Sequence, residues 1–307
     1  MRVAVLSGGV GGSRFVRALV ELLGQAAVTV VGNVGDDVDV LGLHVSPDLD
    51  SVLYALAGVN DEVRGWGRAG ETWQALETVA ALGGESWFSL GDRDLGLHLV
   101  RTQALGEGEP LSAVTARLAA ALGIETRVLP ATDDRLRTWI VTPAGEFPFQ
   151  EWFVARGHQD EVDAVRFEGA EAATPAPGVL HAIDGADLLL IAPSNPYVST
   201  GPILAVGPVR EALAARRVPC VAVSPLIGGR AVKGPADRML ARLAGGTSPR
   251  HVARAYEGLI DALVVDEADV DDLGGLGDVR PVVTHTLMVD ADARRRLAEA
   301  ALGAVPA

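Results

Sequence analysis

Hydrophobic positions in the first 60 residues switch between short continuous runs and helical periods. Residues 3–6 form an apolar run that is typical of a buried strand, and the apolar positions from Phe15 to residue 23 then recur at helical spacing. A second apolar run covers 28–31, and the polar, glycine-containing segment 33–39 follows it as a loop. Strand, loop, helix and strand in this order predict the opening of a Rossmann-like, doubly wound α/β fold with a mainly parallel sheet.

The pattern changes near residue 60 and returns near residue 183. Residues 61–182 lack a regular alternation of strands and helices and contain all five tryptophans, so we predict a mostly helical insertion with a hairpin near 138–149. Later strand candidates are 187–192, 218–224, 262–265 and 280–284, followed by a terminal helix over 291–302. The chain is therefore expected to be one α/β unit of residues 1–307, with a core of about 1–60 and 183–307 and an insertion of about 61–182.

The formal net charge of −14 narrows the range of partners. Such an acidic surface repels phosphate backbones and anionic lipids, so neither nucleic acid nor a membrane is expected as a partner. Cys220 is the single cysteine, which excludes an internal disulfide and fits a reducing compartment, and its apolar neighbours predict a buried strand thiol. With no signal-peptide pattern and no membrane-length apolar run, a cytoplasmic protein is expected.

A glycine-rich turn joins the first strand to the first helix. Gly9, Gly11 and Gly12 let the backbone approach a ligand closely, and the helix that follows offers free amides to a phosphate. The dinucleotide fingerprint is broken after Gly11, and Asn33 stands where NAD-binding folds place an acid, so NAD binding is disfavoured. No lysine follows the glycines, which excludes the Walker pattern. A tight turn without a ligand is the alternative.

Clustered carboxylates follow the second strand. Asp36 and Asp37 come directly after it, with Asp39 close behind and Asp48 and Asp50 soon after. Carboxylates without cysteines or regularly spaced histidines suit a hard cation such as Mg²⁺, which prefers oxygen ligands and bridges phosphates. Helix capping and solvated loops are the alternative explanation.

Two further segments carry candidate binding residues. The aromatic pair 87–88 leads into a turn that contains Ser89, Gly91 and Asp92, and such a segment would stack against and hydrogen-bond a flat heterocycle. Core packing of the aromatic residues and helix capping by the aspartate are the alternative. Ser194 and Asn195 lie in a proline-rich turn after the strand 187–192, at the carboxyl end where α/β folds bind ligands. Asn195 is suited to reading the edge of a base or ribose.

A second glycine-containing loop follows the strand 218–224. Gly228, Gly229 and Lys233, the single lysine of the chain, make it a candidate phosphate-binding loop that would offset the acidic surface locally. The acidic residues between 266 and 272 are expected to form a solvated loop.

Eight ordered segments together resemble the family of 2-phospho-L-lactate transferases that make precursors of coenzyme F420. The segments are 8–14, 33–37, 47–54, 65–67, 87–102, 150–152, 194–204 and 224–235. They cover residues 1 to about 240 in order, and eight ordered motifs are far more specific than any one of them.

The resemblance implies a Rossmann-like core with a mainly helical insertion, often as a homodimer. Members of the family transfer a phosphorylated three-carbon acid from a guanosine diphosphate adduct to the ribityl hydroxyl of the deazaflavin FO, releasing GMP and requiring Mg²⁺. The transferred group resembles phosphoenolpyruvate in the actinobacterial branch and is phospholactate in the archaeal branch. The arginine-rich, lysine-poor composition favours the actinobacterial branch.

The resemblance also assigns roles to residues of this chain. Asp36 and Asp50 are expected to hold the metal, with Asp48 beside them orienting the acceptor hydroxyl. The residues expected to bind the nucleotide are Gly9, Gly11, Gly12, Ser194, Asn195, Gly228, Gly229 and Lys233. Ser89, Gly91 and Asp92 are expected to form part of the deazaflavin pocket.

Two other functions compete with the transferase. A family of sugar-nucleotide-binding metabolic regulators shares the core and the early glycine loop but has no catalysis; the aromatic segment before Asp92 and the segment 150–152 favour the transferase, because a regulator needs no pocket for a flat acceptor. The second alternative is a nucleotide-dependent oxidoreductase. The broken dinucleotide fingerprint and the presence of Asn33 in place of an acid argue against it.

Overall fold

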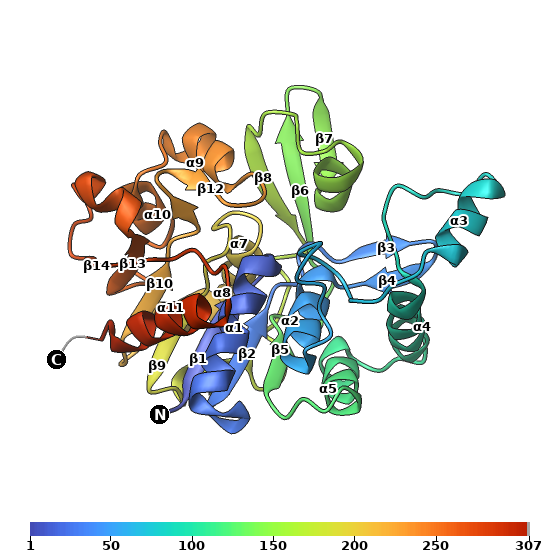
Figure 1. Cartoon of the computed structure of the whole chain (residues 1–307), viewed down its shortest axis with the longest axis horizontal. Helices are drawn as coiled ribbons and strands as arrows, with labels where there is room; N and C mark the ends of the chain where they lie inside the picture. Colours follow the sequence, from blue (N-terminus) through green and yellow to red (C-terminus); the bar gives the residue numbers. More distant parts are fainter. Residues whose placement is uncertain (306–307) are drawn as a thin grey trace.

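A seven-stranded, fully parallel sheet forms the centre of the computed structural model, which describes residues 1–305 (Figure 1). Its strand order is β14-β13-β10-β9-β1-β2-β5, and every neighbouring pair is parallel. The strands are β1 (Val3–Ser7), β2 (Val28–Gly32), β5 (Arg127–Pro130), β9 (Leu188–Ile191), β10 (Cys220–Val223), β13 (Ala262–Asp266) and β14 (Arg280–Thr284). The predicted doubly wound α/β fold is confirmed.

Helices and small sheets surround the central sheet. The helices are α1 (Gly9–Leu23), α2 (Pro47–Ala57), α3 (Gln74–Ala81), α4 (Asp92–Gly106), α5 (Leu111–Ala121), α6 (Val179–Asp184), α7 (Thr200–Ala205), α8 (Gly207–Ala214), α9 (Ala236–Ala244), α10 (Pro249–Ala255) and α11 (Ala291–Gly303), with short turns η1 (Gln25–Ala27), η2 (Glu151–Ala155) and η3 (Glu267–Asp272). The small sheets are β3 (Val38–Val40) with β4 (Leu43–Val45), β11 (Leu226–Ile227) with β12 (Arg230–Ala231), and β7 (Gly145–Pro148)-β6 (Arg137–Thr142)-β8 (Ala164–Glu168). Among residues 1–305, no helix combines the length and apolar character needed to cross a membrane.

The core explains why continuous apolar runs became strands. β1, β9, β10 and β13 are buried along their whole length, as expected for parallel strands covered on both faces. Helix α1 packs on the sheet through an apolar stripe that includes Phe15, Val16 and Leu19. Cys220 is buried in β10, as predicted, and its burial raises the pKa of its thiol to about 12.

The strand order reverses beside β1. The chain runs outward from β1 through β2 to β5, then returns to β9 and runs the other way through β10 and β13 to β14. Right-handed crossovers place the connecting helices of the two halves on opposite faces. Figure 1 shows α1 and α2 in front of the sheet, and the terminal helix α11, which follows the last strand, returns to this face and packs against α1. The carboxyl ends of β1 and β9 therefore border the crevice where folds of this class bind ligands.

Residues 61–182 were expected to lie outside the core, but they contribute β5 to the central sheet, where it pairs with β2. This edge strand has only four residues and lacks the apolar run that identifies the inner strands. The hairpin predicted near 138–149 is confirmed as β6 and β7. The hairpin of β3 and β4 within and after the predicted loop 33–39 was not foreseen.

Candidate functional site

The crevice between β1 and β9 brings together segments that lie far apart in the sequence. The Oγ of Ser194, after β9, donates a 2.6 Å hydrogen bond to the carbonyl of Gly8, after β1. Asn33, after β2, donates to the carbonyl of Val198 at 3.2 Å. The carboxylate of Asp48, in the first turn of α2, lies against the same loop, since a Cβ atom on Gly8 would be 2.5 Å from Asp48 Oδ2. The first glycine loop, the carboxylate segments and the loop after β9 therefore form one site.

Asn33 organises two of the predicted carboxylates. Its side chain is fully buried, and its Nδ2 donates to Asp36 Oδ1 at 3.0 Å and to Asp48 Oδ2 at 2.9 Å. Its Oδ1 accepts from the amide of Gly35 at 2.8 Å, which fixes the direction of the carboxamide. Gln150, from the segment before η2, donates to a second oxygen of Asp36 at 3.3 Å. The two carboxylates are therefore held beside one another by neutral donors.

The carboxylate group, defined here as Asp36, Asp37 and Asp48, carries more negative charge than its surroundings neutralise. Burial raises the pKa of Asp36 well above its usual value, and the charges of Asp48 and Asp37 raise it further. Burial also raises the pKa of Asp48 to about 6, although hydrogen bonds from Asn33 and Gly9 oppose the shift.

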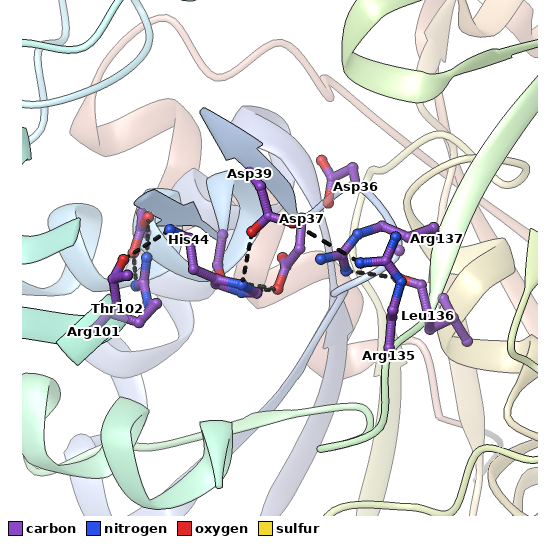
Figure 2. A network of polar contacts seen from close by, with 12 residues as sticks. Asp36, Asp37, Asp39, His44, Arg101, Thr102, Arg135, Leu136 and Arg137 are labelled. Carbon is purple, nitrogen blue, oxygen red and sulfur yellow. Dashed lines mark hydrogen bonds and ion pairs between the residues drawn. The ribbon is translucent and has the colours of Figure 1, made fainter. Parts of the chain in front are cut away.

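Asp37 is turned toward the β3–β4 hairpin. One of its oxygens accepts from Ser46 Oγ at 2.9 Å and contacts His44 Nε2 at 3.0 Å, while its other oxygen is buried without a hydrogen-bond partner. Figure 2 shows His44 between Asp37 and Asp39, with Arg135 and Arg137 on the opposite side of the group. The buried, partly unpaired oxygens are a suitable setting for a bound cation.

Asp50, predicted as the second metal carboxylate, points to a different partner. Both of its oxygens accept hydrogen bonds from the guanidinium of Arg101, one of them at 3.0 Å. Arg101 is fully buried and comes from α4, so this ion pair joins α4 to α2. His98 lies 3.8 Å from Asp50, but burial lowers its pKa to about 4 and keeps it neutral near pH 7. The charge of Asp50 is thus compensated by the protein.

The carboxylate group fits a hard cation better than Asp50 does. Among residues 1–305, no set of three or more His, Cys, Asp or Glu side chains is arranged to hold a metal alone. Mg²⁺ does not require such a set, since it commonly takes one or two carboxylates and completes its shell with water and substrate phosphates. Asp36 and Asp48, buried and close together with incompletely neutralised charge, meet that requirement.

The pH dependence of stability tests the state of Asp48. Because its pKa in the folded protein is about 6, against 3.8 ordinarily, the folded state keeps a proton that the unfolded state has lost between these values. The stabilising contribution of protonated Asp48 to the free energy of unfolding is thus fully present below about pH 4 and is lost as the pH rises through about 6. We expect Asp48→Asn to remove about 3 kcal/mol of this pH-dependent loss of stability, measured by urea unfolding in EDTA. Identical pH slopes for both proteins would contradict the buried, poorly neutralised state.

The first glycine loop packs tightly against the protein itself. A Cβ atom on Gly11 would lie 2.8 Å from the carbonyl oxygen of Pro193, and one on Gly12 would lie 2.5 Å from Ser7 Oγ. These two glycines therefore let α1 approach the loop after β9, a role distinct from contact with a ligand. Gly9 adopts a positive φ of 70°, which starts the helix directly after the strand.

This packing makes Gly12→Ala destabilising. We expect a loss of about 1–3 kcal/mol, because the added methyl group overlaps Ser7 Oγ and approaches Ser194 Oγ at 2.9 Å. Ser7 Oγ is buried without a hydrogen-bond partner, so Ser7→Ala should restore part of the loss in the double variant. Thermal unfolding of the three variants measures this, and equal stability of Gly12→Ala and the parent protein would exclude the steric account.

The second glycine loop is occupied by a side chain. The amides of Gly228 and Gly229 donate to the two oxygens of Asp269 at 3.1 and 2.9 Å. Asp269 and Asp266 are buried, so the expectation of a solvated acidic loop was wrong for these two residues. The predicted phosphate-binding amides are therefore engaged by a carboxylate of the chain.

Asn195 likewise has internal partners. Its Oδ1 accepts from the amide of Tyr197 at 2.9 Å, which shapes the turn, and its Nδ2 lies 3.3 Å from Met239 Sδ. Ser194 is buried and bonded to Gly8, as described above. Ser194 and Asn195 therefore follow the carboxyl end of β9, as the sequence predicts.

Two of the three predicted acceptor residues lie at the starts of helices. Asp92 accepts from the amides of Gln74 and Ala75, the first two residues of α3, at 3.1 and 3.0 Å. A Cβ atom on Gly91 would lie 2.2 Å from the carboxyl carbon of Glu71, which in turn accepts from the first amides of α4. Ser89 is exposed. Among the hydrogen bonds of residues 1–305, none joins this segment to the carboxylate group.

The fold and the site define a doubly wound α/β protein with a buried acidic centre at its strand-order reversal. The model of the family "2-phospho-L-lactate transferase CofD" matches residues 3–300, and the chain belongs to this family. This is the family of coenzyme F420 biosynthesis that the eight sequence segments resemble, and the predicted membership of the chain is confirmed.

Curated relatives support the same family over the whole chain. The chain is 46% identical over 311 residues to the "Phosphoenolpyruvate transferase" of Streptomyces griseus subsp. griseus, covering 98% of both. It is 40% identical over 323 residues to the protein of the same name from Mycolicibacterium smegmatis, again covering 98% of both. A crystal structure of protein BH3568 from Bacillus halodurans aligns with a TM-score of 0.67 over 98% of this chain and 99% of that chain. At 19% identity, this last likeness concerns the fold alone.

Proposed function

We propose that this protein transfers the phosphoenolpyruvyl group from its guanosine diphosphate adduct to the hydroxyl of the deazaflavin FO, giving dehydro coenzyme F420-0 and GMP. The observation that carries the proposal is the pair of buried carboxylates, Asp36 and Asp48, joined by Asn33 at the ligand-binding crevice. Relatives of 40–46% identity over the full chain are named phosphoenolpyruvate transferases, which favours this group over phospholactate.

The proposed step is a displacement at phosphorus. The hydroxyl oxygen of the acceptor attacks the phosphorus that carries the three-carbon acid, the bond from that phosphorus to the bridging oxygen breaks, and GMP leaves with the bonding electrons. Asp48 would orient the acceptor hydroxyl through a hydrogen bond, and the hydroxyl proton passes to solvent as the oxygen attacks.

Residues of the crevice position this chemistry. Asn33 holds Asp48 and Asp36 in one orientation, and Gln150 holds Asp36 from the other side. Mg²⁺ held by Asp36 and Asp48 would neutralise the diphosphate of the donor.

A mass-spectrometric assay tests the proposal. Purified protein is incubated with FO, Mg²⁺ and either the phosphoenolpyruvyl or the phospholactyl adduct of guanosine diphosphate. We expect the mass of FO to grow by the phosphoenolpyruvyl increment, with release of GMP, and EDTA to block both. An increase in the mass of FO with the phospholactyl adduct alone would show that phospholactate is the transferred group. Saturable guanine-nucleotide binding without any increase in mass would favour the sugar-nucleotide-binding regulator.

A further inference from the structure

Two basic side chains from distant parts of the chain meet beside the first glycine loop. Arg14 lies on the second turn of α1, and Lys233 lies in the turn between β12 and α9. Both approach Gly65: a Cβ atom added there would lie 2.1 Å from Lys233 Nζ and 4.0 Å from a terminal nitrogen of Arg14. Gly65 has a φ of 81°, so a glycine is favoured here both by the backbone and by the space that Lys233 occupies.

These two cations have no carboxylate partner among the ion pairs of residues 1–305. Arg14 makes one long hydrogen bond of 3.5 Å, to the carbonyl oxygen of Glu62. Arg17, one turn further along the same helix, differs: it pairs with Glu21 at 2.8 Å and with Glu62 at 3.2 Å. In a chain with 40 acidic and 26 basic residues, the half-buried Arg14 and the exposed Lys233 leave two adjacent positive charges available to an external anion.

The surroundings are consistent with an anion. A small cleft lies between α1, α2 and the 60–67 segment, with Ser13, Arg14 and Gly65 in its lining and Lys233 outside it. The one carboxylate in the lining, Asp61, is paired with Arg64 at 3.7 Å. Arg14 lies five residues after Gly9 in α1, so the backbones of these two residues are about 7 Å apart along the helix axis. The start of the helix at Gly9 is where the carboxylate of Asp48 lies. The cation pair is therefore near the reacting centre but displaced from it along α1.

We propose that Arg14 and Lys233 bind the carboxylate of the three-carbon acid carried by the donor. This inference rests on the proposed function. In such a donor the carboxylate is separated from the reacting phosphorus by one oxygen and one carbon, so it lies close to that phosphorus, and the long side chain of Arg14 would have to span the rest of the displacement along α1. A guanidinium binds a planar carboxylate through two parallel hydrogen bonds, and the ammonium of Lys233 adds a point charge. The pair thus distinguishes the loaded adduct from GDP, which lacks this carboxylate.

Equilibrium binding tests the assignment independently of turnover. Calorimetric titrations with Mg²⁺ compare GDP with the phosphoenolpyruvyl adduct for the parent protein, Arg14→Met and Lys233→Met, with Arg17→Met as the matched control on α1. We expect each of the first two variants to weaken adduct binding about 10-fold or more, the effect of losing one charged hydrogen bond, and to change GDP binding less than about 2-fold. Arg17→Met should change neither, and Lys233→Arg should recover most of the adduct affinity.

The outcomes separate the inference from the proposed function. Selective loss of adduct binding supports the inference even if the parent protein fails to transfer the group. Equal weakening of GDP and adduct would overturn it in favour of contact with the diphosphate, and unchanged binding of both would overturn it outright. A parent protein that binds GDP but gains no affinity from the three-carbon acid would overturn the inference while leaving the transfer reaction to the mass assay. Melting temperatures of all variants check that they are folded.

Discussion

Replacing Asp50 with alanine is expected to lower the free energy of unfolding by about 3–5 kcal/mol. The substitution leaves the guanidinium of Arg101 fully buried without its carboxylate partner, and an unpaired buried charge is strongly destabilising. His98 cannot replace the lost carboxylate, because its neutral ring accepts at most one of the guanidinium's hydrogen bonds. Urea unfolding at neutral pH measures the loss.

Removing the whole ion pair provides the control. The double variant Asp50→Leu with Arg101→Met is expected to recover most of the stability that either single variant loses, since apolar replacement of a buried pair is often neutral. If Asp50→Ala unfolds like the parent protein and loses only Mg²⁺ binding, Asp50 belongs to the metal site that the sequence predicted.

Much of the fold could be predicted from apolar runs, because strands buried on both faces carry continuous hydrophobic residues. The runs 3–6, 187–192 and 262–265 correspond to β1, β9 and β13. β5 could not be found in this way, since an edge strand of four residues starting with Arg127 has no such run. Its place in the sheet depends on pairing with β2, a contact between segments that local pattern does not record.

The same limit applies to the candidate site. Clustering of Asp36 and Asp48 could be predicted, because both follow strands or begin helices at one sheet edge. The partner of Asp50 could not, since Arg101 reaches it from another helix. In the sequence, Asn33 stands where NAD-binding folds place an acid, and nothing local shows that its carboxamide joins two carboxylates. The local sequence likewise does not show that Asp269 accepts a hydrogen bond from the amide of Gly228.

Asp36→Asn is expected to separate activity from stability. The substitution keeps the size of the side chain, and its carbonyl oxygen still accepts from Asn33, but it removes a charge proposed to hold Mg²⁺. We expect turnover to fall of the order of 10²–10³-fold, the usual effect of losing one electrostatic group at a reacting centre. Mg²⁺ affinity, measured by calorimetry without substrate, should fall with it.

Stability in EDTA should change in the opposite direction. Burial and the neighbouring charges of Asp48 and Asp37 raise the pKa of Asp36 in the folded protein, so ionised Asp36 opposes folding at neutral pH. A neutral asparagine removes that cost, so the variant should be more stable than the parent protein at pH 7.5, and the advantage should shrink as the pH falls and Asp36 becomes protonated. Saturating Mg²⁺ should stabilise the parent protein more than the variant, since only the parent has both carboxylates. An inactive variant that is also less stable at pH 7.5, with the same response to Mg²⁺ as the parent, would show that Asp36 supports the fold and leaves the cation to other groups.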